Sequence, residues 1–182
     1  KLRSVTLVYL PGSNFLIGTF NATSTTDWWV SSGFEGVETV EKGLQVYGSI
    51  HIAICKKIDG TWSIFKSDDY AQTWHEVLNI AYKIYDCVKI LPGRIILNTA
   101  NAFYETVNSG VTWTLGLGLP SAPNASAICN IGSGDILMCT DGRYIWRSVD
   151  LARSWTQVAD QNTIHIHTNT DDGHISTITW TG

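Results

Sequence analysis

Apolar and polar positions alternate over short stretches along the whole chain. The clearest runs, residues 44–55, 86–99 and 126–140, are rich in Ile, Val, Thr and aromatic residues and are separated by Gly, Asn and Asp. This pattern is typical of strands joined by tight turns. No stretch keeps a helical period for about 11 residues. The nearest helical candidate, residues 78–90, lacks an apolar stripe and fits a strand better. The pattern therefore predicts an all-β protein.

An eight-residue motif occurs three times, over residues 67–74, 106–113 and 148–155. Each copy reads Ser or Thr, any, Asp or Asn, any, Gly or a small substitute, any, Ser or Thr, Trp. The closing tryptophans are 39 and 42 residues apart. A fixed period of this length indicates a repeat architecture. The defining residues are Ser67, Asp69, Thr73 and Trp74; Thr106, Asn108, Gly110, Thr112 and Trp113; and Ser148, Asp150, Ser154 and Trp155.

Each copy is interpreted as a clamp that closes a hairpin turn. The acidic or amide side chain can accept bonds from backbone N–H groups two residues on, and the second hydroxyl can bond within the turn. Gly110 suits the left-handed backbone that such a turn needs. Because Ala71 and Ala152 stand at the same place in the other copies, we expect slight strain there. The tryptophan then packs its ring over the corner, and the three rings are expected in equivalent buried settings.

The three clamps in register resemble the Asp-box, or bacterial neuraminidase repeat, family. Weaker repeats accompany them, since Leu10-Pro11-Gly12 recurs as Leu91-Pro92-Gly93, and Asp27-Trp28-Trp29 looks like a decayed fourth clamp. A four-stranded unit of about 40 residues is a propeller blade. We therefore predict a β-propeller of four-stranded antiparallel blades with Asp-box hairpins, about four to five blades in one domain or propeller portion, residues 1–182. The expected repeats are residues 1–42, 43–83, 84–124, 125–163 and a partial repeat, 164–182.

Ring closure has three alternatives: a fragment of a larger propeller, a compact ring of four or five blades, or an arc completed by another chain. An unclosed arc leaves long strand edges, which invite aggregation. We therefore expect residues 164–182 to pair with the first repeat, near residues 5–20, or with a partner chain through self-association or another protein.

Composition excludes two classes of partner. Charged residues make up 15% of the chain, the net charge is −4, and no basic run occurs, which argues against a nucleic-acid groove. The sequence has no run of about 18 apolar residues, so it predicts no membrane span. Eight tryptophans leave five outside the clamps, and these need other roles.

The cysteines and histidines give no metal or cofactor prediction. Cys55, Cys87, Cys129 and Cys139 lie in apolar strands and are expected to be buried thiols. A Cys129–Cys139 bridge is the alternative, and metal binding by these thiols is disfavoured. His165 and His167 alternate on one strand, and His174 could join them around a divalent ion. An exposed polar strand face is the favoured interpretation.

An enzyme is the first functional hypothesis, because the resembled family includes sialidases. The resemblance implies three substrate-holding arginines, a Tyr–Glu pair and an acid. The characteristic Arg-Ile-Pro start is absent; Arg94-Ile95-Ile96 lacks the proline. No carboxylate pair forms a motif, and the clamps are not catalytic in that family. We therefore predict no catalytic residue, with a fragment of a sialidase-like glycoside hydrolase as the alternative. The arginines are Arg3, Arg94, Arg143, Arg147 and Arg153.

A binding module is the favoured hypothesis. Trp28 and Trp29, with Asp27 and Asn21, form the best cluster for stacking on a sugar and bonding its hydroxyls. The competing interpretation is the decayed clamp. A structural role in an assembly is the third hypothesis and is compatible with binding. We predict a non-catalytic propeller that is a binding or assembly module for a glycan or protein ligand, within a viral tail, spike or surface structure, with an extracellular or virion-surface location.

Overall fold

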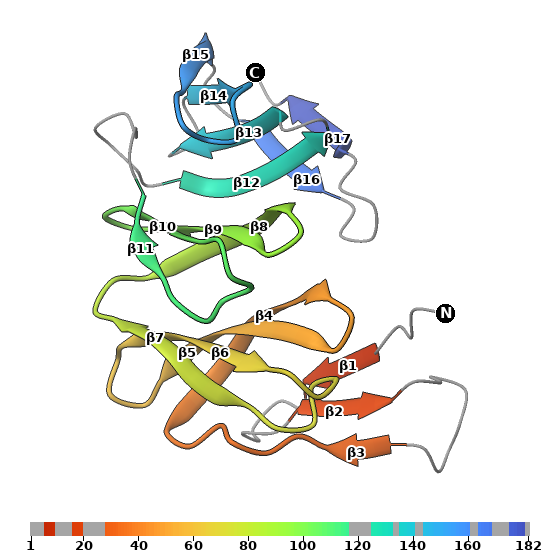
Figure 1. Cartoon of the computed structure of the whole chain (residues 1–182). Coiled ribbons are helices and arrows are strands. Elements are labelled where there is room, and N and C mark those ends of the chain that lie inside the picture. Colours follow the sequence, from red (N-terminus) through yellow and green to blue (C-terminus); the bar gives the residue numbers. More distant parts are fainter. Residues whose placement is uncertain are drawn as a thin grey trace. The chain divides into compact units, whose positions relative to one another are not determined.

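The computed structural model describes residues 6–9, 16–19, 28–116, 125–132, 135–140, 144–160, 164–168 and 175–180. Throughout this part of the chain the regular elements are strands, and neighbouring strands of each sheet are antiparallel (Figure 1). The predicted all-β class is therefore confirmed. Residues 78–90, the one helical candidate, divide between two strands and a turn.

Three sheets have four strands each, in the sequential order of a meander. Their strands are β4 (Val37–Tyr47), β5 (Ile50–Lys57), β6 (Trp62–Ser67) and β7 (His75–Ile80); β8 (Ile84–Leu91), β9 (Arg94–Thr99), β10 (Phe103–Thr106) and β11 (Thr114–Leu115); and β12 (Ala125–Gly132), β13 (Asp135–Thr140), β14 (Tyr144–Ser148) and β15 (Thr156–Asp160). Each clamp lies between the third and fourth strands of its sheet, as predicted for propeller blades.

Two further sheets are smaller. One has three strands, β1 (Thr6–Tyr9), β2 (Leu16–Thr19) and β3 (Trp28–Val30), and the other has two, β16 (Ile164–Thr168) and β17 (Ile175–Trp180). The predicted pairing of the partial repeat with the first repeat or with another chain stays a prediction.

The chain divides into two units, residues 1–81 with 108–112 and residues 82–107 with 113–182. Within the second unit the first strands of successive sheets lie side by side, β12 against β8 and β16 against β12. Hydrogen bonds of two side chains link β12 to β8. The Ile128 N–H donates to Asp86 Oδ2 at 3.2 Å, and Asn130 Nδ2 donates to the carbonyls of Lys89 and Ile90 at 3.1 and 3.2 Å. Such packing of first strands is the arrangement of adjacent blades.

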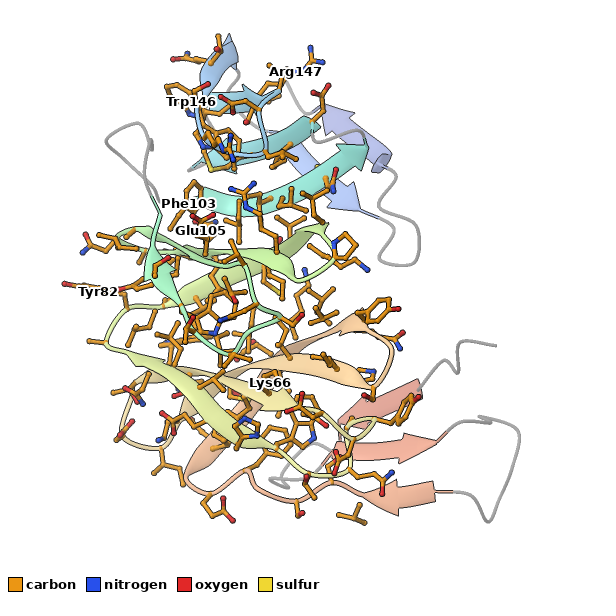
Figure 2. All side chains as sticks on the ribbon, viewed as in Figure 1. Lys66, Tyr82, Phe103, Glu105, Trp146 and Arg147 are labelled. Atoms are coloured by element: carbon orange, nitrogen blue, oxygen red, sulfur yellow. The ribbon has the colours of Figure 1, made fainter. Side chains whose placement is uncertain are left out.

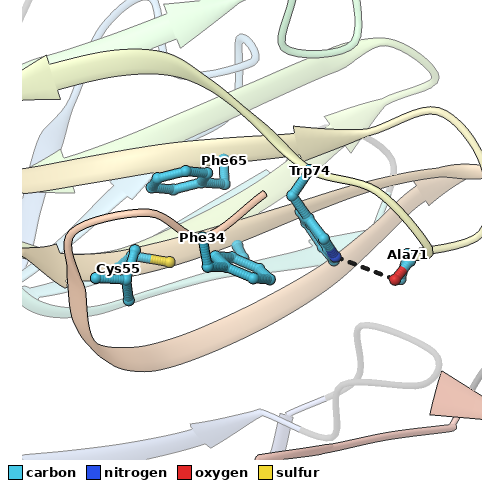
Figure 3. Packing of buried hydrophobic residues seen from close by; sticks show 7 residues of the cluster. Phe34, Cys55, Phe65, Ala71 and Trp74 are labelled. Carbon is cyan, nitrogen blue, oxygen red and sulfur yellow. Dashed lines mark hydrogen bonds between the residues drawn. The ribbon is translucent and has the colours of Figure 1, made fainter. Parts of the chain in front are cut away.

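Each unit has an apolar cluster centred on its middle strands. In the first unit the Phe34 ring lies 5.2 Å from Phe65 and 5.1 Å from Trp74, beside Cys55 (Figure 3). The second cluster lies between the sheets β8–β11 and β12–β15 and contains Ile90, Ile96, Phe103, Ile128, Ile136, Met138 and Ala152. Continuous apolar runs form the middle strands because both of their faces are covered.

The segment after β3 does not form a fourth strand of its own sheet. Instead it lies on the neighbouring sheet, where Ser32 N–H donates to Gln72 O at 3.0 Å and Trp74 N–H donates to Ser32 O at 2.9 Å. Gly33 has φ +94°, and a Cβ there would overlap the Trp74 carbonyl. The sheet β1–β3 therefore has three strands within the described residues.

Two sequence-based interpretations are wrong. Trp28 and Trp29 lie in β3, the third strand of its sheet, whereas each clamp tryptophan directly precedes a fourth strand. Residues 27–29 are therefore not a decayed clamp. The Cys129–Cys139 bridge is also wrong: Cys129 is a buried thiol that lies opposite Leu137, two positions out of register with Cys139.

Candidate functional site

The first clamp is held by a bidentate carboxylate. Asp69 Oδ1 accepts the N–H groups of Gln72 at 3.1 Å and Thr73 at 2.8 Å, and Asp69 Oδ2 accepts the Thr73 hydroxyl at 2.6 Å. Ser67 Oγ donates to Asp69 Oδ1 at 2.8 Å and accepts the Ala71 N–H at 2.9 Å. The two hydroxyl positions of the motif thus bond the same carboxylate from opposite ends of the turn.

The third clamp repeats this geometry almost bond for bond. Asp150 Oδ1 accepts the N–H groups of Arg153 at 3.0 Å and Ser154 at 2.8 Å, and Ser148 Oγ accepts the Ala152 N–H at 2.8 Å. Ser148 and Ser154 both donate their hydroxyls to the Asp150 carboxylate. Two turns 81 residues apart in the sequence therefore close through the same chemistry.

The second clamp uses an amide in place of the carboxylate. Asn108 Oδ1 accepts the Thr112 N–H at 2.9 Å, and Asn108 Nδ2 donates to the Thr112 hydroxyl at 2.9 Å. Because an amide has one acceptor oxygen and a carboxylate has two, the hydroxyl here must accept rather than donate. The amide therefore preserves the turn while it reverses one hydrogen bond.

Every clamp places two consecutive residues in the left-handed region, where sequence reasoning expected one. The pairs, with their φ values, are Tyr70 (60°) and Ala71 (65°), Ser109 (58°) and Gly110 (87°), and Leu151 (62°) and Ala152 (64°). A left-handed non-glycine residue costs about 1–2 kcal/mol. The strain expected at Ala71 and Ala152 is thus present, and the bonds to the clamp serines offset it.

The three clamp tryptophans differ in environment, so the expected equivalence of their settings is wrong in detail. Trp74 is 4% exposed and donates Nε1–H to Ala71 O at 3.1 Å (Figure 3). Trp113 and Trp155 are half-buried, and their buried Nε1 atoms have no partner in the part of the chain that the structure describes. Trp155 instead packs its ring 5.8 Å from Phe103.

The clamp carboxylates are held in the ionised form. Partial burial opposes ionisation of Asp69, but hydrogen bonds from Thr73, Ser67 and Gln72 outweigh it and lower its pKa. Bonds from the Ser154 hydroxyl, the Ser154 N–H and the Ser148 hydroxyl hold the pKa of Asp150 well below its usual range. Hydrogen bonds to the charged form always act in this direction.

The structure describes only some of the predicted ligand residues. Asn21 and Asp27 lie outside the described residues, and the structure describes the backbone of Trp28 and Trp29 but not their side chains. Tyr82, which is 48% exposed and projects from the ribbon before β8 (Figure 2), is an exposed aromatic that the sequence did not single out. It lies between β7 and β8, where strand alternation gives no signal.

Two arginines form ion pairs at equivalent positions of neighbouring sheets. Arg94, the first residue of β9, bonds Glu105 Oε2 through Nε at 3.2 Å and Nη2 at 2.9 Å. In the next sheet the signs are reversed: Asp135 begins β13, and Arg147 of β14 binds it (Figure 2). Arg94 and Arg147 are each paired with a carboxylate of their own sheet, so the two arginines do not converge on a common point.

The described residues contain no cluster of His, Cys, Asp and Glu that could hold a metal ion. None of their elements is a helix able to span a membrane.

No protein-family model and no curated protein sequence matches the chain. Solved structures match it at low identity. A GH74 enzyme from Niastella koreensis is 14% identical, with a TM-score of 0.65 over 84% of this chain and 22% of that chain. The GH74 xyloglucanase from Xanthomonas campestris is 14% identical, with a TM-score of 0.55 over 79% of this chain and 26% of that chain. YCF48 from Cyanidioschyzon merolae is 13% identical, with a TM-score of 0.53 over 84% of this chain and 39% of that chain.

The chain spans less than half the length of each of these proteins. At such identities the likeness shows the fold alone, which is that of β-propeller proteins. Proteins as different as GH74 enzymes and YCF48 share this fold, so the fold does not assign a function to the chain.

Proposed function

We propose that the chain is part of an Asp-box propeller that binds a glycan or protein ligand without catalysis. The observation that carries this proposal is the state of the arginines. Arg94 and Arg147 are each held by a carboxylate on a neighbouring strand. A sialidase-like site needs arginines that converge on the substrate carboxylate, and these two would have to abandon their ion pairs to do so.

The clamps support the family assignment within this proposal. Three copies recur with the same left-handed pair, and in the first and third copies two hydroxyls share one carboxylate. These bonds serve the turn itself. A carboxylate that accepts several hydrogen bonds and stays ionised has neither the proton nor the open coordination of a general acid. The clamps therefore act as structural elements of the proposed blades at residues 43–83, 84–124 and 125–163. The repeat at residues 1–42 and a partial repeat at 164–182 complete the proposed domain.

In this proposal the ligand is bound by Trp28, Trp29, Asp27 and Asn21. Indole rings stack on the apolar faces of sugars or peptide side chains, and the carboxylate and amide bond their polar groups. In this proposal a partner chain, or a second copy, completes the propeller, and the assembly lies on a cell or virion surface. The low charged fraction, 15%, suits such packing against other protein.

A fragment of a sialidase-like glycoside hydrolase is the second candidate, supported by the fold likeness to the GH74 enzymes. A hydrolase of this kind needs two carboxyl groups on either side of the scissile bond. Glu105 and Asp135 are occupied by arginines. The catalytic pair would then have to come from other carboxylates or from another part of the protein.

A glycan array and a panel of chromogenic glycosides separate the candidates. Trp28→Ala should weaken glycan binding by about tenfold, roughly 1.4 kcal/mol, because a stacked ring is lost. Its melting temperature should stay unchanged. Tyr82→Ala removes an exposed aromatic side chain from the segment between β7 and β8 and should bind as the unmodified chain does.

Two outcomes would contradict the proposal, and a third would restrict it to a protein ligand. Turnover of a glycoside that one carboxylate substitution abolishes favours the hydrolase. Equal loss in Trp28→Ala and Tyr82→Ala removes the predicted ligand surface. Silence in both assays eliminates glycans and leaves a protein ligand, which capture by size-exclusion with candidate partner chains then tests.

A further inference from the structure

One ionisable ring occupies a core position that is aliphatic in the sister sheets. In each four-stranded sheet, one residue of the second strand lies directly opposite the first hydroxyl residue of the clamp. These residues are His51 (opposite Ser67), Ile95 (opposite Thr106) and Ile136 (opposite Ser148). His51 is 2% exposed, and both isoleucines are 0% exposed. Only the first clamp therefore rests on a group that can gain a proton.

His51 is joined to the clamp through a single carbonyl oxygen. Its Nδ1 lies 3.0 Å from Ser49 O, and the same oxygen accepts the Tyr70 N–H at 3.0 Å. Tyr70 is the first left-handed residue of the clamp. Because a carbonyl only accepts, Nδ1 carries the hydrogen and Nε2 is the bare nitrogen. Ser49 belongs to the β4–β5 turn, which Gln45 closes by donating to Gly48 O at 2.8 Å.

The bare nitrogen has nothing to bond in this environment. His51 Nε2 is buried and has no hydrogen-bond partner within the described part of the chain. Gln45 of β4 and Ser67 of β6 lie opposite His51 in the sheet and are uncharged, and Asp69 of the clamp is the charged group that acts on it. Burial lowers the pKa of His51, while the Ser49 carbonyl and the Asp69 charge partly oppose this effect. A proton on Nε2 would create a buried donor without an acceptor.

We propose that His51 makes the first clamp an acid-sensitive switch: on mild acidification the protonated ring leaves the interior, releases Ser49 from Tyr70, and loosens the β4–β5 turn and the clamp. The third clamp, which rests on Ile136, stays closed. The switch is independent of which ligand the propeller binds.

The sign of the pH dependence follows from linkage. His51 has a lower pKa in the folded chain than its ordinary value of 6.5. Below that value the open state therefore binds more protons than the closed state, and opening becomes easier as the pH falls. The opening constant rises by at most about tenfold per pH unit until the folded pKa is reached, and by nothing above about pH 7.

Amide hydrogen exchange resolved by residue tests the switch, because the chain carries its own control. Protection of the Ala71 and Thr73 N–H groups should fall by up to about fifteenfold between pH 6.5 and pH 5, after correction for intrinsic exchange rates. Protection of the Ala152 and Ser154 N–H groups should stay constant. Equal losses in the two clamps, or no loss in the first, would overturn the proposal.

Substitution completes the test. His51→Ile copies the residue of the sister sheets and should abolish the pH dependence of the first clamp. His75→Gln removes an exposed histidine of β7 and should leave that dependence intact. If His51→Ile does not fold, the ring resonances of the unmodified chain still decide, since a His51 that titrates at or above 6.5 contradicts the switch.

Discussion

Substitution of Gly33 by alanine tests whether the segment after β3 is truly held on the neighbouring sheet. Gly33 has φ +94°, and a Cβ would overlap the Trp74 carbonyl oxygen. Backbone atoms cannot rotate away as a side chain does, so the segment must move off the sheet. That movement breaks the two backbone bonds of Ser32, with Gln72 and Trp74.

The magnitude is the sum of three costs. A left-handed alanine costs about 1–2 kcal/mol, and two lost backbone hydrogen bonds cost about 0.5–1.5 kcal/mol each. The Phe34 ring, one residue on, also loses part of its packing between Phe65 and Trp74. We therefore expect Gly33→Ala to lower the free energy of unfolding by about 3–5 kcal/mol.

Gly60→Ala is the matched control. Gly60 has φ +85°, but a Cβ there meets nothing within 4 Å. It should cost only the conformational term, about 1–2 kcal/mol. Urea unfolding followed by tryptophan fluorescence measures both variants on the same scale. If Gly33→Ala lies within about 1 kcal/mol of Gly60→Ala, the close contact with Trp74 is not a stabilising feature and the reasoning fails.

Three further predictions concern the clamps. Trp74→Phe should cost about 1 kcal/mol more than Trp155→Phe in chemical denaturation, because Trp74 has an indole hydrogen bond to lose, whereas Trp155 Nε1 has no partner among the described residues; equal costs would contradict that bond. The stabilisation from ionised Asp150 is complete above about pH 3.8 and disappears as the pH falls through its lower folded pKa. The melting temperature of Asp150→Asn should therefore vary less between pH 5 and pH 2 than that of the unmodified chain. Asn108→Asp should stabilise the second clamp by about 0.5 kcal/mol at pH 7 and by nothing at pH 2; a gain that persists at pH 2 would show that charge is not its cause.

Local signals in the sequence predict much of this fold because each clamp carries its own turn chemistry. The motif positions the third and fourth strands of a blade without reference to distant residues. The predicted strand run at residues 86–99, for example, is occupied by most of β8, which begins at Ile84, and by β9, which ends at Thr99. The all-β class and the meander order follow from the same signals.

Tertiary contacts decide what the local signals miss. Residues 31–34 leave their own sheet because Gly33 fits against the Trp74 backbone and Phe34 fits between two rings, about 40 residues away in the sequence. Trp28 and Trp29 resemble a clamp end by composition, but their pairing with β2 makes them part of a third strand. The position of His51 was also out of reach: it lies 16 residues before Ser67, whereas Ile95 and Ile136 lie 11 and 12 residues before Thr106 and Ser148. Only the strand register shows that the three residues occupy the same place in their sheets.

The reversed ion pairs bear on how a chain of similar repeats avoids exchanging its hairpins. Such chains are prone to misassembly, because a strand of one repeat resembles the corresponding strand of the next. If β9 paired with β14, Arg94 would face Arg147, and if β13 paired with β10, Asp135 would face Glu105. Like charges in such proximity repel, whereas the native pairings attract. The reversal of charge from one sheet to the next thus favours the native strand pairing over exchange between hairpins while the chain folds. Each ion pair itself adds little to the stability of the folded protein.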